Sequence, residues 1–303
     1  MTEVEVTKTE MAKRLIKAYV ITPLLLIKRS KTGFAGFLTL LALILLSTIG
    51  PIFVPPDLET KPFGQRFLPP SWEHPLGTDY LGRDILSHIV NGGGVVLEVG
   101  FLTGFLTVLI AVVLGMLAGF KGGFIESIIM YAADILLTIP QFPLLMMIVG
   151  LRIMNFSDPL PLSLLLAALS WPSLCRAIRS QVLSIKERDF IEAAKALDLG
   201  TKHIMFSEIM PNMMSYIAVS FIYAMTGAVY SQVGLVVLGF IPFQITNWGV
   251  MINRAWSLGT LYYKNSIWQI LFPIIMIAVL QTASIMFSRS LEAVFNPRLR
   301  ESE

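Results

Sequence analysis

The chain has 303 residues, of which 55% are hydrophobic and 14% are charged, with a formal net charge of +3. A mean hydropathy of +0.71 excludes an ordinary soluble domain and indicates a multi-span membrane protein, and so modest a charge makes nucleic acid an unsuitable partner. One cysteine, Cys175, excludes an internal disulfide, and the three histidines, His74, His88 and His203, lack metal-ligand spacing.

The first apolar run, residues 34–54, follows a basic flank that is too long for a secretory signal peptide, and we interpret it as a retained signal anchor. A transmembrane helix needs about 20 apolar residues. Six segments meet this requirement: 34–54, 95–119, 124–151, 160–178, 213–239 and 267–288. The fourth is the weakest, because Pro161 opens it and Pro172 interrupts it. We therefore predict an all-α membrane protein with about six transmembrane helices.

The distribution of lysine and arginine predicts the orientation of these helices. With a cytoplasmic amino terminus, cytoplasmic segments hold 17 of these residues and external segments hold 6, as expected when positive charge is retained inside. We therefore predict that both termini are cytoplasmic. The predicted parts are a cytoplasmic segment 1–33, a first transmembrane helix 34–54, an extracytoplasmic loop 55–94, a core transmembrane domain 95–288 and a cytoplasmic tail 289–303. The core includes a cytoplasmic helix at about 185–200 and an external loop at about 240–266.

The second and third spans carry glycines, a carboxylate and prolines. The pairs Gly100/Gly104 and Gly115/Gly119 place small residues one helical turn apart, which favours close helix crossings. Asp134 lies in an apolar span, where a carboxylate is costly unless it faces protein or water, so it either lines a substrate path or bonds to neighbouring helices. Pro140 and Pro143 predict a kink that serves either packing or a gate.

Between the fourth and fifth spans, residues 185–199 read as a short amphipathic helix. Arg188, Glu192 and Lys195 have the spacing of ion pairs on one exposed side. Ala193, Ala196 and Leu197 form an apolar patch that projects little from the helix, so a partner could approach closely. Next in the chain, Gly200 is expected to adopt positive φ, Thr201 to cap a second helix, and Pro211 to break that helix. The pattern alone leaves a connecting helix and a partner-binding helix equally open.

Five motifs in chain order resemble one family of membrane proteins. Glu192-Ala193-Ala194, a turn, and Ile209-Met210-Pro211 resemble the EAA signature of permease subunits of ABC importers. The other four resemble the C-type permease of the dipeptide, oligopeptide and nickel importer family over about residues 30–300. They are His74 to Asp84, Met130 to Asp134 with Pro140, Trp248-Gly249-Val250-Met251, and Asn296-Pro297-Arg298-Leu299.

The chain departs from the family pattern at the turn after the EAA residues. Asp198 occupies the place of the usual glycine, Gly200 follows two residues later, and Met210 replaces a leucine. Aspartate tolerates the left-handed conformation better than most residues. We therefore expect the turn to be kept, although its position is not fixed by the sequence.

The resemblance implies a type I ABC importer permease in a prokaryotic inner membrane. It implies three kinds of partner besides the lipid bilayer: a homologous second permease, two cytoplasmic ATPase subunits and an extracytoplasmic solute-binding protein. The chain itself would be no enzyme and hold no cofactor, with ATP and magnesium on the ATPases. Gly92-Gly93-Gly94 is not a phosphate loop, because no Gly-Lys-Ser/Thr follows.

The resemblance also assigns roles to residues. The ATPase-coupling set is Arg188, Glu192, Ala193, Ala194, Ala196, Leu197, Asp198, Gly200, Ile209 and Pro211. Candidates for the pathway or gate are Asp134, Pro140 and Pro143, with a structural role favoured for Asp134. Candidates for docking the binding protein or shaping the outer gate are Asp79, Arg83, Asp84 and Trp248. Peptides are the expected cargo, and the alternative cargoes are oligosaccharides and nickel complexes. The alternative classes of protein are a stand-alone secondary transporter and a membrane-embedded enzyme.

Overall fold

The computed structural model describes residues 28, 30–241, 247–263 and 265–295, and its regular elements are helices. Within these residues the one β pairing is an isolated bridge between Thr78 and Asp84. Five helices are long and apolar enough to cross a membrane: α3 (Lys31–Thr48), α5 (Ile85–Lys121), α8 (Pro159–Lys186), α12 (Met214–Val237) and α14 (Trp268–Phe295). A bent pair, α6 (Gly123–Thr138) and α7 (Gln141–Gly150), makes a sixth crossing if it counts as one span.

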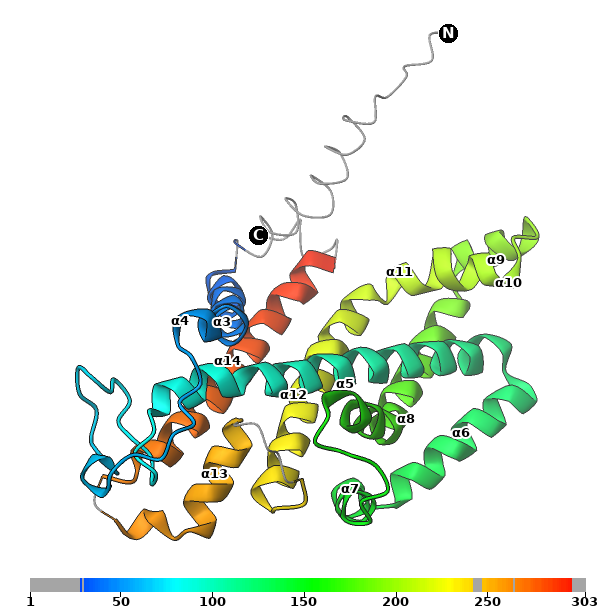
Figure 1. Cartoon of the computed structure of the whole chain (residues 1–303). Helices are drawn as coiled ribbons and strands as arrows, with labels where there is room; N and C mark the ends of the chain where they lie inside the picture. Colours follow the sequence, from blue (N-terminus) through cyan, green and yellow to red (C-terminus); the bar gives the residue numbers. More distant parts are fainter. Residues whose placement is uncertain (1–27, 29, 242–246, 264, 296–303) are drawn as a thin grey trace.

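Short helices fill the connections and gather at two opposite ends of the molecule (Figure 1). One end holds α9 (Asp189–Ala196), α10 (Thr201–His203), the π-helix η3 (Ile204–Ile209) and α11 (Met210–Asn212). The other holds α13 (Trp248–Ser257), η4 (Thr260–Tyr262), α4 (Gly50–Phe53) and the long loop, which we define as residues 54–84 and which contains η2 (Phe63–Gln65).

Helices α5 and α8 are among those that extend beyond the predicted spans. α5 begins at Ile85, ten residues before the predicted start at 95, because the Asp84 side chain accepts a hydrogen bond from the Leu86 N–H (2.7 Å) and caps the helix. α8 continues past 178 to Lys186, with Pro172 inside it. Burial of Trp171 and Cys175 next to this proline holds the helix in place despite the missing backbone donor.

α5 is the central helix, and its glycines set the two main crossings. A Cβ on Gly115 would lie 2.7 Å from the Cys175 carbonyl of α8, and one on Gly104 would lie 3.0 Å from the Met225 nitrogen of α12. Side chains at these positions would push the helix axes apart. The close crossings predicted from both glycine pairs are therefore present, one with α8 and one with α12.

The predicted kink in the third span is also present. α6 and α7 meet at an angle of 81°, and Pro140 is the residue immediately before α7. Pro143 lies in the first turn of α7, where a backbone N–H has no partner within the helix, so that proline is accommodated without loss of a hydrogen bond.

Candidate functional site

The segment between α8 and α12, residues 187–212, folds as several short helices. The prediction of a single helix over 185–200 is wrong, because α8 runs through Lys186 and α9 begins only at Asp189. Arg188 is extended (φ −85°, ψ 146°) and its carbonyl accepts from the Ile191 N–H (2.9 Å). This turn separates a two-turn helix from the end of the membrane span.

α9 has one buried and one exposed face. Ile191 and Ala194 are buried in a cluster with Val182 and Ile185 of α8. The opposite face exposes Glu192, Ala193, Lys195, Ala196 and Leu197, and Leu197 is 73% exposed. The apolar patch predicted from the sequence is therefore on the surface. The predicted charge pairing is wrong, because the ion pairs within the described part of the chain do not include Glu192.

The turn after α9 depends on Asp198. Its φ is +54°, its N–H donates to the Lys195 carbonyl (3.0 Å), and the next N–H, that of Leu199, donates to the Ala194 carbonyl (3.1 Å). This pair of bonds is a Schellman motif with aspartate in the left-handed position that glycine usually takes. The expectation that the turn is kept, with Asp198 in place of the usual glycine, is thus confirmed.

The two expectations for the residues that follow are wrong. Gly200 has φ −52°, so it does not supply positive φ, and Thr201 does not cap the next helix through its side chain. The reason is that Asp198 already reverses the chain, which leaves Gly200 as the residue before α10. The prediction for Pro211 holds, since α11 ends at Asn212 and α12 starts at Met214. Ile209 is fully buried and anchors this part, whereas Pro211 is exposed.

Asp134 forms an ion pair that the sequence analysis missed. Its carboxylate accepts from the Arg176 guanidinium of α8, and Glu126 on α6 pairs with Arg179 on α8 in the same way. The side chains of Asp134 and Arg176 are 53% and 47% exposed. The sequence analysis did not consider Arg176, which lies near the end of the predicted fourth span, as a partner for Asp134. The pair joins the first part of the bent span to α8.

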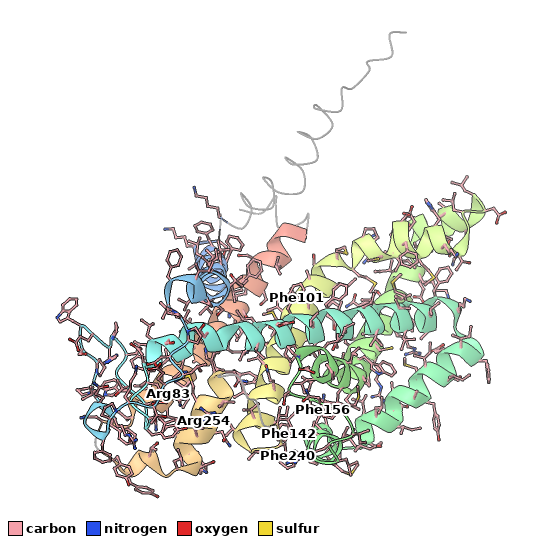
Figure 2. The ribbon with its side chains drawn as sticks, viewed as in Figure 1. Arg83, Phe101, Phe142, Phe156, Phe240 and Arg254 are labelled. Carbon is pink, nitrogen blue, oxygen red and sulfur yellow. The ribbon has the colours of Figure 1, made fainter. Side chains whose placement is uncertain are left out.

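Asp79 and Arg83, named as candidates for docking a partner, are buried within the long loop. Asp79 Oδ2 accepts from Arg83 Nε (2.9 Å) and Nη2 (2.6 Å), while Oδ1 accepts the N–H groups of Leu81 and Arg83. Figure 2 shows Arg83 near Arg254 of α13, and both line a small cavity next to His88. This ion pair closes the loop beside α13.

Asp84 and Trp248 also make their polar contacts within the protein. Asp84 caps α5 and also contacts His74 Nδ1 (3.0 Å). Trp248 is fully buried, and its Nε1 donates to the Ile89 carbonyl of α5 (3.0 Å).

Direct docking does not fit the burial of Asp79, Arg83 and Trp248. Asp84 is partly exposed, but its carboxylate is already used by the α5 cap and His74. The docking role therefore stays a prediction for the surface around these residues. That surface carries exposed aromatic residues: Phe63, Trp72, Trp256 and Tyr262.

A polar cavity of about 460 Å³ lies where α5, α7, α8 and α12 meet. Sequence analysis did not identify it. Its polar lining comprises Thr107, Gln141, Ser170, Ser173, Tyr216, Ser220, Tyr223 and Ser231. The missed signal is a column of polar or small residues on α12 at spacings of four and three: Tyr216, Ser220, Tyr223 and Gly227. Tyr230 continues this spacing beyond the residues that line the cavity.

Residues 111–301 match a family described as the binding-protein-dependent transport system inner membrane component. The chain belongs to this family. Similar curated proteins include the dipeptide transport system permease protein DppC of Bacillus subtilis (strain 168), 29% identical over 275 residues, which are 90% of this chain and 84% of that protein. The oligopeptide transport system permease protein OppC of the same organism is 28% identical, covering 90% and 88%.

A third relative, a putative peptide permease protein of Brucella suis biovar 1 (strain 1330), is 30% identical over 67% of this chain and 66% of its own. The permease is thus a multi-pass membrane protein of ABC importers, which decides between the classes that the sequence left open. The family match includes α9, its Schellman turn and the polar cavity. The Asn296 to Leu299 motif lies outside the described residues.

Proposed function

We propose that this permease imports short peptides and that its α9 receives the motion of separate ATPase subunits. Relatives named as dipeptide and oligopeptide permeases support the choice of cargo. The observation that carries the coupling role is the exposed face of α9 on a helix whose other face is locked to α8. A connecting helix without a partner has no need of a patch in which Leu197 is 73% exposed.

The patch suits a groove in a partner. The side chains of Ala193 and Ala196 are small, so a partner's backbone can approach α9 closely. Glu192 beside them supplies one unpaired charge. Because Ile191 and Ala194 are packed against α8 and η3, α9 moves with these helices as a rigid unit. ATP-driven closure of the ATPases would then displace the spans attached to α9, provided that the ATPases bind the two permease states differently.

This proposal includes the other partners and the orientation. A second homologous permease completes the membrane pathway, a solute-binding protein delivers cargo, and ATP and magnesium are bound by the two ATPase subunits. The segment 187–212 lies on the cytoplasmic side, and the long loop with α13 lies outside. The placement of these two groups at opposite ends of the molecule supports this orientation (Figure 1), as does the excess of lysine and arginine in the predicted cytoplasmic segments.

Bulk on the α9 patch tests the coupling role. Ala193→Trp should leave membrane insertion and the amount of permease unchanged, because Ala193 is exposed and makes no core contact. We expect uptake and the cargo-stimulated ATPase activity of the reconstituted importer to fall by about tenfold, the middle of the range for coupling between sites.

The matched control is Thr60→Trp, which adds similar bulk at an exposed position of the long loop at the other end of the molecule. This control should retain both activities. Normal uptake by the Ala193→Trp importer would refute the coupling role of α9.

A further inference from the structure

The tyrosine column of α12, defined as Tyr216, Tyr223 and Tyr230, is exposed along most of a membrane span. The three side chains are 36%, 56% and 50% exposed. Fourteen residues separate the first from the last, which is about 21 Å of helix in a hydrocarbon core of about 30 Å. Tyrosines that anchor a helix at the membrane interface lie at its ends. These three cannot all lie at interfaces, so part of the column faces something other than lipid.

The surroundings of the column are also polar. Ser220 and Ser231 lie beside it on α12, and Ser170 of α8 accepts a hydrogen bond from Gln141 Nε2 at the bend between α6 and α7 (2.8 Å). Thr107 of α5 lines the same cavity, is 2% exposed, and its hydroxyl has no hydrogen-bond partner among the described residues. The hollow of about 460 Å³ therefore presents polar side chains from α5, α7, α8 and α12.

The side chains of the cavity wall that the structure describes carry no formal charge. Among the described residues that line it, none is Asp, Glu, Lys, Arg or His. The charged residue that follows Ser173 most closely on α8, Arg176, is paired with Asp134. Hydroxyl, amide and aromatic groups therefore dominate the wall, which suits neutral hydrogen bonding and contact with aromatic faces.

We propose that the tyrosine column and the hydroxyls around it form the cargo-contacting wall of this half of the pathway. The wall recognises the backbone of an extended chain and does not select for side-chain charge. Seven residues of helix separate successive tyrosines, about 10.5 Å, which equals the length of about three residues of an extended peptide at about 3.4 Å each. The part of this inference that names a peptide as cargo rests on the proposed function. The part that places the wall against water does not depend on the proposed function.

Cysteine accessibility tests whether the wall faces the aqueous path. Cys175 is the one cysteine of the chain, so Cys175→Ala provides a background for single cysteines. In that background Tyr223→Cys is compared with Phe105→Cys on α5, because Tyr223 and Phe105 are similarly exposed, at 56% and 52%. The probe is a charged methanethiosulfonate reagent that does not cross membranes, applied to the assembled importer with and without ATP.

We expect Tyr223→Cys to react at least about tenfold faster than Phe105→Cys in one nucleotide state, since the reagent reacts with a thiolate in water and is excluded from lipid. Equal rates in both states would overturn the assignment, because the column would then face lipid or packed protein. If wild-type importer takes up no peptide while Tyr223→Cys still reacts rapidly, the wall stands and the proposed cargo is wrong.

Cargo charge tests the recognition chemistry. We expect the wild-type importer, at saturating binding protein, to transport Ala-Ala-Ala, Ala-Glu-Ala and Ala-Lys-Ala at rates within about threefold of one another, because the wall has no charge to distinguish them. Tyr223→Asp should slow Ala-Glu-Ala by about tenfold relative to Ala-Lys-Ala, whereas Tyr223→Phe should preserve the wild-type pattern. An equal effect of Tyr223→Asp on all three peptides would overturn the proposal.

Discussion

Asp198 shows how one residue fixes the geometry of the segment 187–212. Its φ is +54°, and the N–H groups of Asp198 and Leu199 donate to carbonyls of α9, which turns the chain between α9 and α10. Leu199 then packs against the cluster that holds Ile191 and Ala194. The orientation of the exposed patch therefore depends on a backbone conformation that few residue types tolerate.

Two substitutions of Asp198 distinguish the contribution of its backbone conformation to uptake from the contribution of its carboxylate. Asp198→Gly removes the carboxylate but accepts positive φ, so uptake should remain near the wild-type rate. Asp198→Val removes the same carboxylate and strains the turn by roughly 1–2 kcal/mol, so uptake and stimulated ATPase activity should fall severalfold. Both are measured on reconstituted importer at equal permease content. Equal losses in the two variants would instead assign the role to the carboxylate.

At the scale of helices, packing depends on glycines where α5 crosses α8 and α12. Gly115→Ala should lower the thermal unfolding temperature of the purified permease, because the new Cβ would lie 2.7 Å from the Cys175 carbonyl and α8 must move. Gly94→Ala on the same helix is the matched control, since its Cβ would lie 3.5 Å from the nearest neighbour, the Ser47 carbonyl oxygen of α3. It should leave the temperature unchanged or raise it through better helix propensity. A similar loss in both would show that the close crossing does not limit stability.

These crossings, the six spans and the kink at Pro140 were predictable from the sequence because each follows from local spacing or composition. Helix ends were less predictable, since the start of α5 depends on the Asp84 cap and the length of α8 depends on packing around Pro172. Asp134 and Arg176 are 42 residues apart in the chain, so their pairing requires α6 and α8 to lie side by side. No periodicity in either span indicates that contact.

Burial in the long loop was unpredictable for a similar reason. Its prolines and charged residues indicated an exposed surface, whereas Asp79 and Arg83 satisfy one another and are 5% and 6% exposed. The tyrosine column, by contrast, was visible as a regular spacing in α12. Only the hollow beside it, built by α5, α7 and α8, distinguishes that spacing from ordinary helix packing.

The whole permease has a distinct surface at each end and a polar hollow between its spans. α9 presents the exposed patch at one end, while the long loop and α13 form the other (Figure 1). The α5 to α8 crossing and the ion pairs from α6 to α8 connect these parts through continuous helices. Movement of α9 can therefore reach the walls of the hollow without a flexible linker.

The central claim is that α9 contacts an ATPase, and site-directed cross-linking measures that contact most directly. In the Cys175→Ala background, Leu197→Cys in the assembled importer is treated with a short thiol-to-amine reagent, and Thr60→Cys serves as the exposed control at the other end. We expect the ATPase subunit to be cross-linked to Leu197→Cys and not to Thr60→Cys. Absence of that product from importer that still contains both subunits would contradict the account.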